Sequence, residues 1–424
     1  MIETMERITA RYYIETPYAV EKAAEVLAGE QSSGTFVTVP GETEELKSRF
    51  AARVEQIEVL ETVSEPAIPG ASSPDGRYRR ALVDVSWSIE NFGQNLPALV
   101  STLQGNLYEI RQFTGLKLMD IHFPEHYAEH YHGPHFGIGG CRALTGAPAG
   151  RPLIGTIIKP SVGLAPEQTA GMVQTLAEAG IDFVKDDELM ASTANSPFET
   201  RVEAVMAVIN RHADRTGKKV MYAFNISDEM DAMHRKYDYV VQSGGTCAMI
   251  SINSVGLSAT RRICDLGQLA IHGHRNGWGM LNRHPLLGIE FPAYQKLWRL
   301  AGVDQLHVNG IDNKFWESDD SVVRSIASCL DPAPLGKPLL PVVSSGQWGG
   351  QAFETYRRTQ TTDLLYMAGG GIMAHPGGAA AGVTALQQAW EAAVSGLTPE
   401  EAAHQYPEFG QSVEKFGKLP FKRI

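Results

Sequence analysis

The chain has 424 residues, of which 43% are hydrophobic and 20% are charged, an ordinary balance for a globular protein. Its 37 Lys and Arg residues against 48 Asp and Glu residues give a net charge of −11, which argues against a nucleic-acid surface, because such a surface must be basic. No run approaches the ~20 apolar residues that a membrane helix needs. Four widely spaced cysteines favour reduced thiols. We therefore expect a cytoplasmic protein that contacts neither nucleic acid nor membrane.

Residues 1–135 contain strand and helix patterns in irregular alternation. β-Branched and aromatic residues indicate the strands, and apolar residues at helical spacing indicate the helices. The predicted strands are 8–14, 32–39, 79–89 and 116–123, and the predicted helices are 18–30 and 96–104. This pattern predicts a small α+β domain of the ferredoxin-like type.

Residues 136–424 follow a regular rhythm, in which short apolar runs end in a polar or glycine-rich tip and a helical stretch follows. The eight runs begin at Leu153, Ile181, Lys219, Cys247, Gln268, Gln305, Leu339 and Leu364. Eight strand–helix units in about 250 residues are typical of a parallel (β/α)8 TIM barrel, an α/β fold. An open, doubly wound sheet is the alternative, but its G-x-G-x-x-G motif is absent from the first strand–helix turn.

The polar tips of these runs predict an active site, because TIM barrels place catalysis at the carboxyl ends of their strands. The tip residues are Lys159, Lys185, Asp186, Asp187, Glu188, Asn225, His272, His274, Arg275, His307, Asn309, Ser344, Ser345 and Gly369–Gly371. So many charged and polar side chains at one end of a barrel favour an enzyme over a purely structural protein.

The second tip, KDDE, predicts a metal site. Alternate residues of a strand face the same side, so Lys185 and Asp187 face the barrel interior and Glu188 begins the loop. Two carboxylates beside a lysine form a hard-oxygen site that suits Mg²⁺. A salt bridge at the strand end is the alternative for an isolated KDDE, and the other charged tips favour the metal.

Other tips suit phosphate groups. Arg275, His307 and Ser344 offer charge-assisted hydrogen bonds and a hydroxyl donor. Gly369–Gly371 open the last helix, where backbone N–H groups can bind a second anion, although a tight turn is the alternative. His272 is interpreted as structural, because it shares its side with His274 only while the strand stays regular.

Several motifs occur in a fixed order. They are GTIIKPSVGL, GIDFVKDDE, HGHR, PVVSSG and MAGGGIMAHPGG, with His307 followed seven residues later by Lys314 and with GEQSSGTF and QGN upstream. Together they resemble the large chain of ribulose-1,5-bisphosphate carboxylase (Rubisco) over nearly the whole chain. The resemblance implies an N-terminal α+β domain and a (β/α)8 barrel, as the periodicity does.

The resemblance also implies roles for individual residues. Lys185 would carry a carbamate formed with CO₂ and would hold Mg²⁺ together with Asp187 and Glu188. The implied catalytic residues are Lys159, Lys314 and His274. The implied substrate and phosphate contacts are Arg275, His307, Ser344, Gly369, Gly370, Asn106, Glu30 and Thr35. The last three would come from a partner subunit, so the active unit would be a homodimer or a higher oligomer.

The chain departs from the carboxylase pattern at three places. The first strand is followed by Lys-Pro-Ser, with Ser161 where carboxylases have a second lysine. Phe315 and Trp316 follow Lys314 in a loop that is rich in Gly, Thr and Val in carboxylases, and Trp278 replaces a second histidine. These departures predict a Rubisco-like protein of the form IV type that does not fix CO₂.

By elimination, we expect a carboxy-lyase that decarboxylates 3-oxo-isoapionate 4-phosphate in apiose breakdown. The alternatives are an enolase of 2,3-diketo-5-methylthiopentyl 1-phosphate, which carries a lysine where this chain has Asn106, and a methylthioribulose-phosphate isomerase. A true carboxylase and a non-catalytic scaffold also remain open. The enzymatic alternatives share an enolate stabilised beside a divalent cation, and a small phosphorylated sugar or sugar acid as substrate.

Overall fold

The structure, a computed structural model, describes residues 6–33 and 39–417. Internal contacts divide the chain into two compact units. The first comprises Met1–His132, Gly277–Leu300 and Ala333–Gly336, and the second comprises Gly133–Asn276, Ala301–Pro332 and Lys337–Ile424. The predicted boundary at residue 135 is close to the first crossing, whereas the segment 277–300, which was predicted inside the barrel domain, groups with the N-terminal unit.

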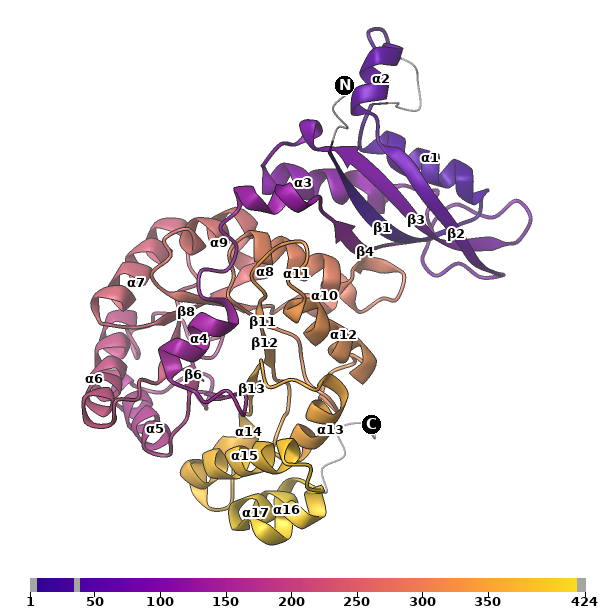
Figure 1. Ribbon diagram of the computed structural model, residues 1–424. Helices are drawn as coiled ribbons and strands as arrows, with labels where there is room; N and C mark the ends of the chain where they lie inside the picture. The colour runs from indigo at the N-terminus through magenta and orange to yellow at the C-terminus, as the bar shows by residue number, and fades with distance from the viewer. Residues whose placement is uncertain (1–5, 34–38, 418–424) are drawn as a thin grey trace. The chain divides into compact units, whose positions relative to one another are not determined.

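A five-stranded sheet forms the N-terminal unit (Figure 1). Its strands are β1 (Arg7–Thr16), β2 (Arg53–Val63), β3 (Tyr78–Ser88), β4 (Gly115–His122) and β10 (Leu287–Ile289), in the order β10-β4-β1-β3-β2. Helices α1 (Val20–Glu30) and α2 (Glu44–Phe50) lie between β1 and β2 in the chain, and α3 (Leu96–Leu103) lies between β3 and β4. The order β4-β1-β3-β2, with antiparallel neighbours, is the ferredoxin-like arrangement that the sequence predicts.

Strand β1 is central in this sheet because it pairs with both β3 and β4, and its alternating burial shows that one of its faces is covered. Ile8, Ala10, Tyr12 and Ile14 are fully buried, and the residues between them are partly exposed. The Tyr12 hydroxyl donates to the Leu103 carbonyl oxygen at the end of α3 (2.6 Å), so this helix covers the buried face.

The predicted strands at 8–14, 79–89 and 116–123 correspond to β1, β3 and β4. The predicted strand at 32–39 falls largely on residues 34–38, outside the described residues. Strand β2 has no counterpart in the sequence predictions, because it is largely exposed and its charged residues hide the strand pattern.

Eight parallel strands close into a barrel in the second unit. They are β5 (Leu153–Ile157), β6 (Phe183–Lys185), β7 (Met221–Asn225), β8 (Cys247–Ser251), β9 (Ala270–His274), β11 (Gln305–His307), β12 (Leu340–Val343) and β13 (Leu365–Met367). Each strand falls within one of the eight predicted runs. The predicted (β/α)8 barrel is therefore confirmed.

Alternate residues of the strands fill the barrel interior. Pairs two positions apart, such as Met221 with Ala223 and Leu340 with Val342, belong to one buried cluster. Helix α4 (Gly137–Thr145), which precedes β5, contributes Cys141 to the same cluster. The interior is thus a packed core, and polar side chains that follow in the same alternation emerge at its carboxyl end.

Helices follow the barrel strands and lie outside them (Figure 1). They are α5 (Pro166–Glu178), α6 (Phe198–Thr216), α7 (Met230–Gln242), α8 (Ile252–Val255), α9 (Leu257–Cys264), α12 (Asp319–Leu330), α13 (Gly350–Thr359), α14 (Gly370–Met373) and α15 (Gly378–Val394), with α16 (Pro399–Gln405) and α17 (Pro407–Phe416) last. No helix within the described ranges combines the length and apolarity needed to cross a membrane.

The chain leaves this pattern between β9 and β11. Residues 277–300, with α10 (Trp278–Asn282), β10 and α11 (Phe291–Leu300), join the N-terminal unit. Strand β10 pairs with β4, and Lys117 of β4 donates to the Asn282 and His284 carbonyl oxygens at 2.9 Å each. Local periodicity cannot reveal this, because an amphipathic helix has the same pattern whichever sheet it covers.

Candidate active site

Strand β6 directs Lys185 into the barrel. Phe183 belongs to the interior cluster, and Lys185 lies two residues later on the same side. Lys185 is fully buried, and its Nζ donates to the Asp186 carbonyl oxygen (2.8 Å) and lies 3.4 Å from Met249 Sδ of β8. The amine is thus held inside the carboxyl end of the barrel.

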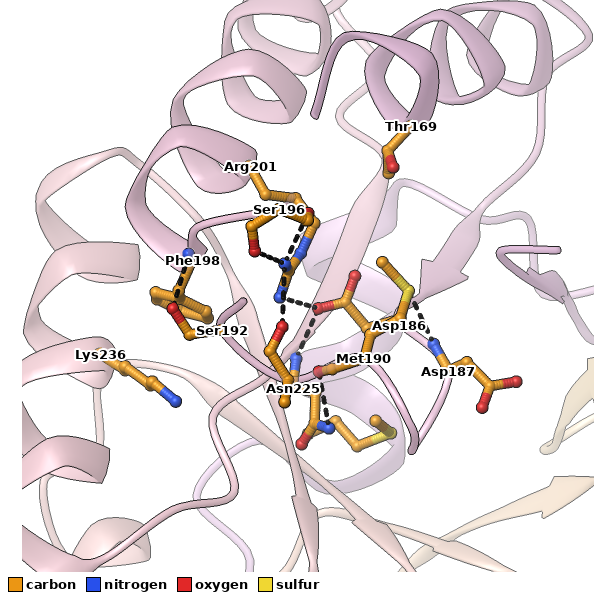
Figure 2. A network of polar contacts seen from close by, with 12 residues as sticks. Thr169, Asp186, Asp187, Met190, Ser192, Ser196, Phe198, Arg201, Asn225 and Lys236 are labelled. Atoms are coloured by element: carbon orange, nitrogen blue, oxygen red, sulfur yellow. Dashed lines mark hydrogen bonds and ion pairs between the residues drawn. The ribbon is translucent and has the colours of Figure 1, made fainter. Parts of the chain in front are cut away.

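Asp186 faces the opposite way, between β6 and α6 (Figure 2). Its carboxylate accepts hydrogen bonds from the Tyr222 hydroxyl (2.6 Å), the Asn225 N–H (2.9 Å) and the Arg201 guanidinium (3.3 Å). Figure 2 shows the Asp187 carboxylate turned away from this network. Asp186 therefore fixes the position of the backbone segment that carries Lys185 and Asp187.

Asp187 is paired with Lys159. The Lys159 Nζ donates to Asp187 Oδ2 and to Ser161 Oγ, each at 2.7 Å. Burial alone would raise the pKa of Asp187, but hydrogen bonds, foremost that from Lys159, lower it below its ordinary value. Asp187 is therefore an anion near neutral pH, and the loop after β5 places a cation directly on it.

Glu188 lies between Lys185 and His274. Its Oε2 is 3.5 Å from Lys185 Nζ and 3.4 Å from His274 Nε2. Burial, aided by the charge of Lys185, lowers the pKa of His274 to about 3, so its imidazole is neutral. Burial also lowers the pKa of Lys185, against the opposing effect of Glu188 and Asp187.

His307 and Ser344 meet beside His274. The His274 and His307 ring centroids are 4.6 Å apart, and His307 Nδ1 is 3.0 Å from Ser344 Oγ. His272 lies deeper, with its Nε2 at 2.8 Å from His307 Nε2. The structure therefore brings together side chains that the sequence placed at the tips of four strands, β6, β9, β11 and β12.

The loop after β11 carries Lys314 to the turn after β12. The Lys314 N–H donates to the Ser345 carbonyl oxygen (3.1 Å), and its Nζ lies 5.2 Å from the Phe315 ring centroid. Asn309 and Ser345 have positive φ angles of 64° and 77°, and the Ser345 hydroxyl donates to Asn309 Oδ1 (2.7 Å). Such left-handed backbone at non-glycine residues is common at functional sites.

Arg275 has a carboxylate partner that the sequence analysis did not foresee. Its guanidinium is 3.1 Å from Glu317 Oε2, and both side chains are buried. Asn309 Nδ2 donates to the same Glu317 oxygen (2.5 Å). A phosphate bound by Arg275 would therefore have to compete with Glu317 for this guanidinium.

The glycine run after β13 begins α14. A Cβ atom on Gly370 would have open space around it, and one on Gly369 would meet only the end of Ile157 at 3.8 Å. A Cβ atom on Gly371 would lie 2.7 Å from the Gln347 carbonyl oxygen. The first two glycines thus leave their backbone open to approach, whereas the third permits close packing.

Glu30 and Asn106 lie in the N-terminal unit, and Thr35 lies outside the described residues. Glu30 ends α1 and lines a cavity of about 410 Å³ together with Lys22 and other residues. Gln31, the residue after Glu30, contacts the backbone of Asn106. In the amide orientation that satisfies both of its partners, its side-chain oxygen accepts from the Asn106 N–H (2.8 Å) and its side-chain nitrogen donates to the Ser101 carbonyl oxygen (3.2 Å). The N-terminal unit therefore holds Glu30 and Asn106 near each other, and Asn106 is exposed.

The residues that depart from the carboxylase pattern have distinct surroundings. Trp278 is buried against Tyr294, with ring centroids 4.6 Å apart, in the N-terminal unit. Phe315 and Trp316 are 53% and 44% exposed. Trp278 is thus a packing residue, while the loop after β11 presents large apolar side chains to its surroundings.

Several neighbours of the site were not predicted from sequence. They are Arg201, Tyr222, Met249, Gln305 and Glu317. Strand alternation could have identified Gln305, because it lies two residues before His307. No local pattern identifies Arg201 or Glu317, since each contacts its partner through the folding of separate segments.

A ferredoxin-like unit followed by a (β/α)8 barrel, with a Lys-Asp-Glu set at the barrel's carboxyl end, defines a Rubisco-type architecture. Residues 142–416 match the family described as ribulose bisphosphate carboxylase large chain, catalytic domain, and residues 3–127 match its N-terminal domain. The chain belongs to the ribulose bisphosphate carboxylase large chain family.

Similar proteins include Rubisco-like members of this family. A crystal structure of a Rubisco-like protein from Burkholderia fungorum has a TM-score of 0.91 and 43% identity, and the match covers 97% of this chain and 100% of that one. A 3-oxo-isoapionate-4-phosphate transcarboxylase/hydrolase from Xanthobacter autotrophicus is 52% identical over 95% of this chain and 97% of its own length. A 3-oxo-isoapionate-4-phosphate decarboxylase from Rhizobium etli is 50% identical over 96% and 98%. The predicted Rubisco-like character is confirmed.

Proposed function

We propose that this protein is a carboxy-lyase that decarboxylates 3-oxo-isoapionate 4-phosphate without fixing CO₂. The observation that carries the proposal is the Lys159–Asp187 pair beside the buried Lys185 and Glu188. The 50% identity to a decarboxylase of this substrate over nearly the whole chain supports the same substrate. The substrate's name describes a β-keto acid, which loses its carboxylate most readily when negative charge is stabilised on the keto oxygen.

The donor set would fit Mg²⁺ once Lys185 carries a carbamate. Without it, no group of three or more His, Cys, Asp or Glu side chains in residues 6–33 and 39–417 could hold a metal. Asp187 and Glu188 provide carboxylate oxygens, and a carbamate on Lys185 would supply the further oxygen that a hard cation needs. Burial of Lys185 favours the neutral amine that reacts with CO₂.

The bound cation would supply positive charge next to the keto oxygen as negative charge develops there. The bond between the carboxylate and the α-carbon breaks, and its electron pair remains on the substrate as an enolate. Lys159, which donates hydrogen bonds in the structure, then gives a proton to that carbon and recovers one from solvent. Lys314, on the loop after β11, would cover the substrate and exclude water.

We propose that the single phosphate group is held by Gly369 and Gly370, whose backbone is open, and that Arg275, three strands away around the barrel, contacts the other end of the substrate once Glu317 yields. His274 and His307 would orient the carbon skeleton as neutral imidazoles.

Because Glu30 and Asn106 belong to the other unit, we propose that they and Thr35 complete a neighbouring subunit's site in a homodimer or higher oligomer. Four free, buried cysteines suit a reducing cytoplasm.

The test is a labelled-carboxyl assay with 3-oxo-isoapionate 4-phosphate and Mg²⁺. We expect the carboxyl label to leave as CO₂, and Lys185→Ala to abolish both turnover and tight Mg²⁺ binding. Lys415→Ala, on an exposed lysine of α17, serves as the control and retains activity. Full activity after metal removal, or in Lys185→Ala, would contradict the proposal.

Transcarboxylation with hydrolysis is the second candidate, because the Xanthobacter autotrophicus relative of that name is 52% identical. A transcarboxylase moves the carboxyl carbon to another atom and does not release it. The same assay therefore separates the two reactions: retention of the label in a non-volatile product identifies transcarboxylation, and its loss as CO₂ identifies decarboxylation.

A further inference from the structure

A row of polar side chains lies inside the barrel beneath Ser344. Alternation directs His272 on β9 and Gln305 with His307 on β11 toward the interior, and Gln305 is in register with His272. All three are buried. The proposed reaction gives no role to His272 or Gln305, although buried polar groups are retained only when they are hydrogen-bonded.

The orientation of Gln305 is fixed by two sulfur atoms. Its Nε2 lies 3.2 Å from Met221 Sδ and 3.3 Å from Cys141 Sγ. A thioether sulfur has no hydrogen to donate, so the amide nitrogen must face Met221. Gln305 Oε1 therefore faces His272 Nδ1 at 2.8 Å, and this imidazole nitrogen must be the donor.

The two histidines then adopt a defined pattern. Burial lowers the pKa of His272 and of His307 well below the ordinary value, so each ring carries one proton. His272 has its proton on Nδ1, so its Nε2 accepts from His307 Nε2–H at 2.8 Å. His307 Nδ1 has no proton and accepts from the Ser344 hydroxyl at 3.0 Å.

We propose that Gln305 and His272 are positioning residues that fix the Nε2–H tautomer of His307 and so make Ser344 a hydrogen-bond acceptor toward the substrate. The single hydroxyl proton of Ser344 goes to His307 Nδ1 at 3.0 Å in preference to Ser345 Oγ at 3.4 Å, so the oxygen lone pairs of Ser344 remain for a ligand. Ser344 would then accept a hydrogen bond from a substrate hydroxyl group. The sequence instead predicts that Ser344 donates to a phosphate.

The same row cannot carry a proton away from the substrate. It ends at Gln305, and a neutral amide accepts a hydrogen bond but no proton near neutral pH. Ser344 therefore orients a hydroxyl group of the substrate and leaves acid–base chemistry to Lys159. The substrate side of this inference rests on the proposed function, whereas the tautomer does not.

Histidine-selective ¹⁵N NMR of the full-length protein tests the tautomer directly, because protonated and bare ring nitrogens differ in chemical shift. The His307 signals are assigned by their loss in His307→Gln. We expect a bare Nδ1 and a protonated Nε2 in the wild type. Gln305→Met, which keeps the side-chain length but removes the acceptor, should move proton population to His307 Nδ1. Gln305→Glu, which keeps an oxygen facing His272, should restore the wild-type pattern.

A protonated His307 Nδ1 in the wild type, or an unchanged pattern in Gln305→Met, would overturn the inference. Kinetics give a second readout with 3-oxo-isoapionate 4-phosphate. We expect kcat/KM to fall on the order of tenfold in Gln305→Met, because the loss of one hydrogen bond has an effect of this size. In Gln305→Glu, kcat/KM should recover. Absence of turnover in the wild type beside the expected NMR pattern would refute the proposed function alone.

Discussion

Lys159 is the residue whose structural setting most directly suits proton transfer. Its Nζ donates to Asp187 Oδ2 and Ser161 Oγ at 2.7 Å each. One neighbour is a carboxylate, and the other is a neutral hydroxyl in the position where carboxylases carry a second lysine. The Lys159 side chain is also 43% exposed, so its amine can exchange a proton with solvent.

We expect Lys159→Met to lower kcat by about 10²- to 10⁴-fold, the usual contribution of a positioned acid, with a much smaller change in KM. Steady-state kinetics with the labelled substrate measure this split. Ser161→Ala is the matched variant, because it removes one partner of the amine and keeps the amine itself, and its effect should be far smaller. A loss confined to KM would assign Lys159 to binding.

The two ends of strand β6 serve different purposes. Lys185 at its carboxyl end belongs to the site, whereas Asp182, just before the strand, lies at the opposite end of the barrel. Asp182 is fully buried and accepts from Arg151 Nη1 (2.5 Å), Lys218 Nζ (2.7 Å) and the Ile154 N–H (2.8 Å). Polar groups at this end of a TIM barrel contribute to stability.

Asp182 gives a pH-dependent prediction. Burial raises its pKa, but Arg151 and Lys218 lower it, and the net pKa lies below the ordinary value. A carboxyl group whose pKa is lowered by folding stabilises the fold above its unfolded pKa of about 4, and this contribution is lost as the pH falls through the folded pKa.

We therefore expect Asp182→Asn to lower the free energy of unfolding by about 2–3 kcal/mol near neutral pH, since Arg151 and Lys218 are only partly buried. The difference from the wild type should shrink at pH values below about 4. Urea denaturation at several pH values measures it, with the exposed Asp214→Asn on α6 as control. A difference that is constant with pH would show that charge at Asp182 is not its source.

At the scale of the whole molecule, the residues proposed for the site belong to two different units. Lys159, Lys185 and their neighbours belong to the barrel, whereas Glu30 and Asn106 belong to the ferredoxin-like unit. The proposed homodimer would let each barrel receive the latter residues from its partner. The exposure of Asn106 agrees with such a role.

Mixing two inactive variants tests this division. We expect Lys185→Ala and Asn106→Ala to be inactive as separate preparations and to regain part of the activity when refolded or co-expressed together, because one site of each mixed dimer is then intact. Light scattering should give the mass of at least two chains. If confirmed mixed dimers regain no activity, Asn106 either serves the site of the chain to which it belongs or lies outside the site.

The sequence predicted the barrel strands well but their surroundings less well. Strands buried on both faces are short apolar runs, so all eight barrel strands were predicted from such runs and the helical stretches that follow them. The exposed, charged strand β2 lacks that signal and was not predicted. Segment 277–300 has ordinary helical periodicity, and its membership of the N-terminal unit depends on pairing between β10 and β4.

The sequence by itself determined the fold class and which side chains lie at the carboxyl ends of the barrel strands, because strand alternation and burial are encoded locally. It thus placed Lys185 and Asp187 on one side of β6 and grouped the strand-tip residues. Only the tertiary structure decided that Glu317 pairs with Arg275, that Arg201 holds Asp186, and that Gln305 orients His272. These contacts join residues on different elements, and the physical reason is that a hydrogen bond depends on distance and direction in space, which closure of the barrel sets and local spacing along the chain does not.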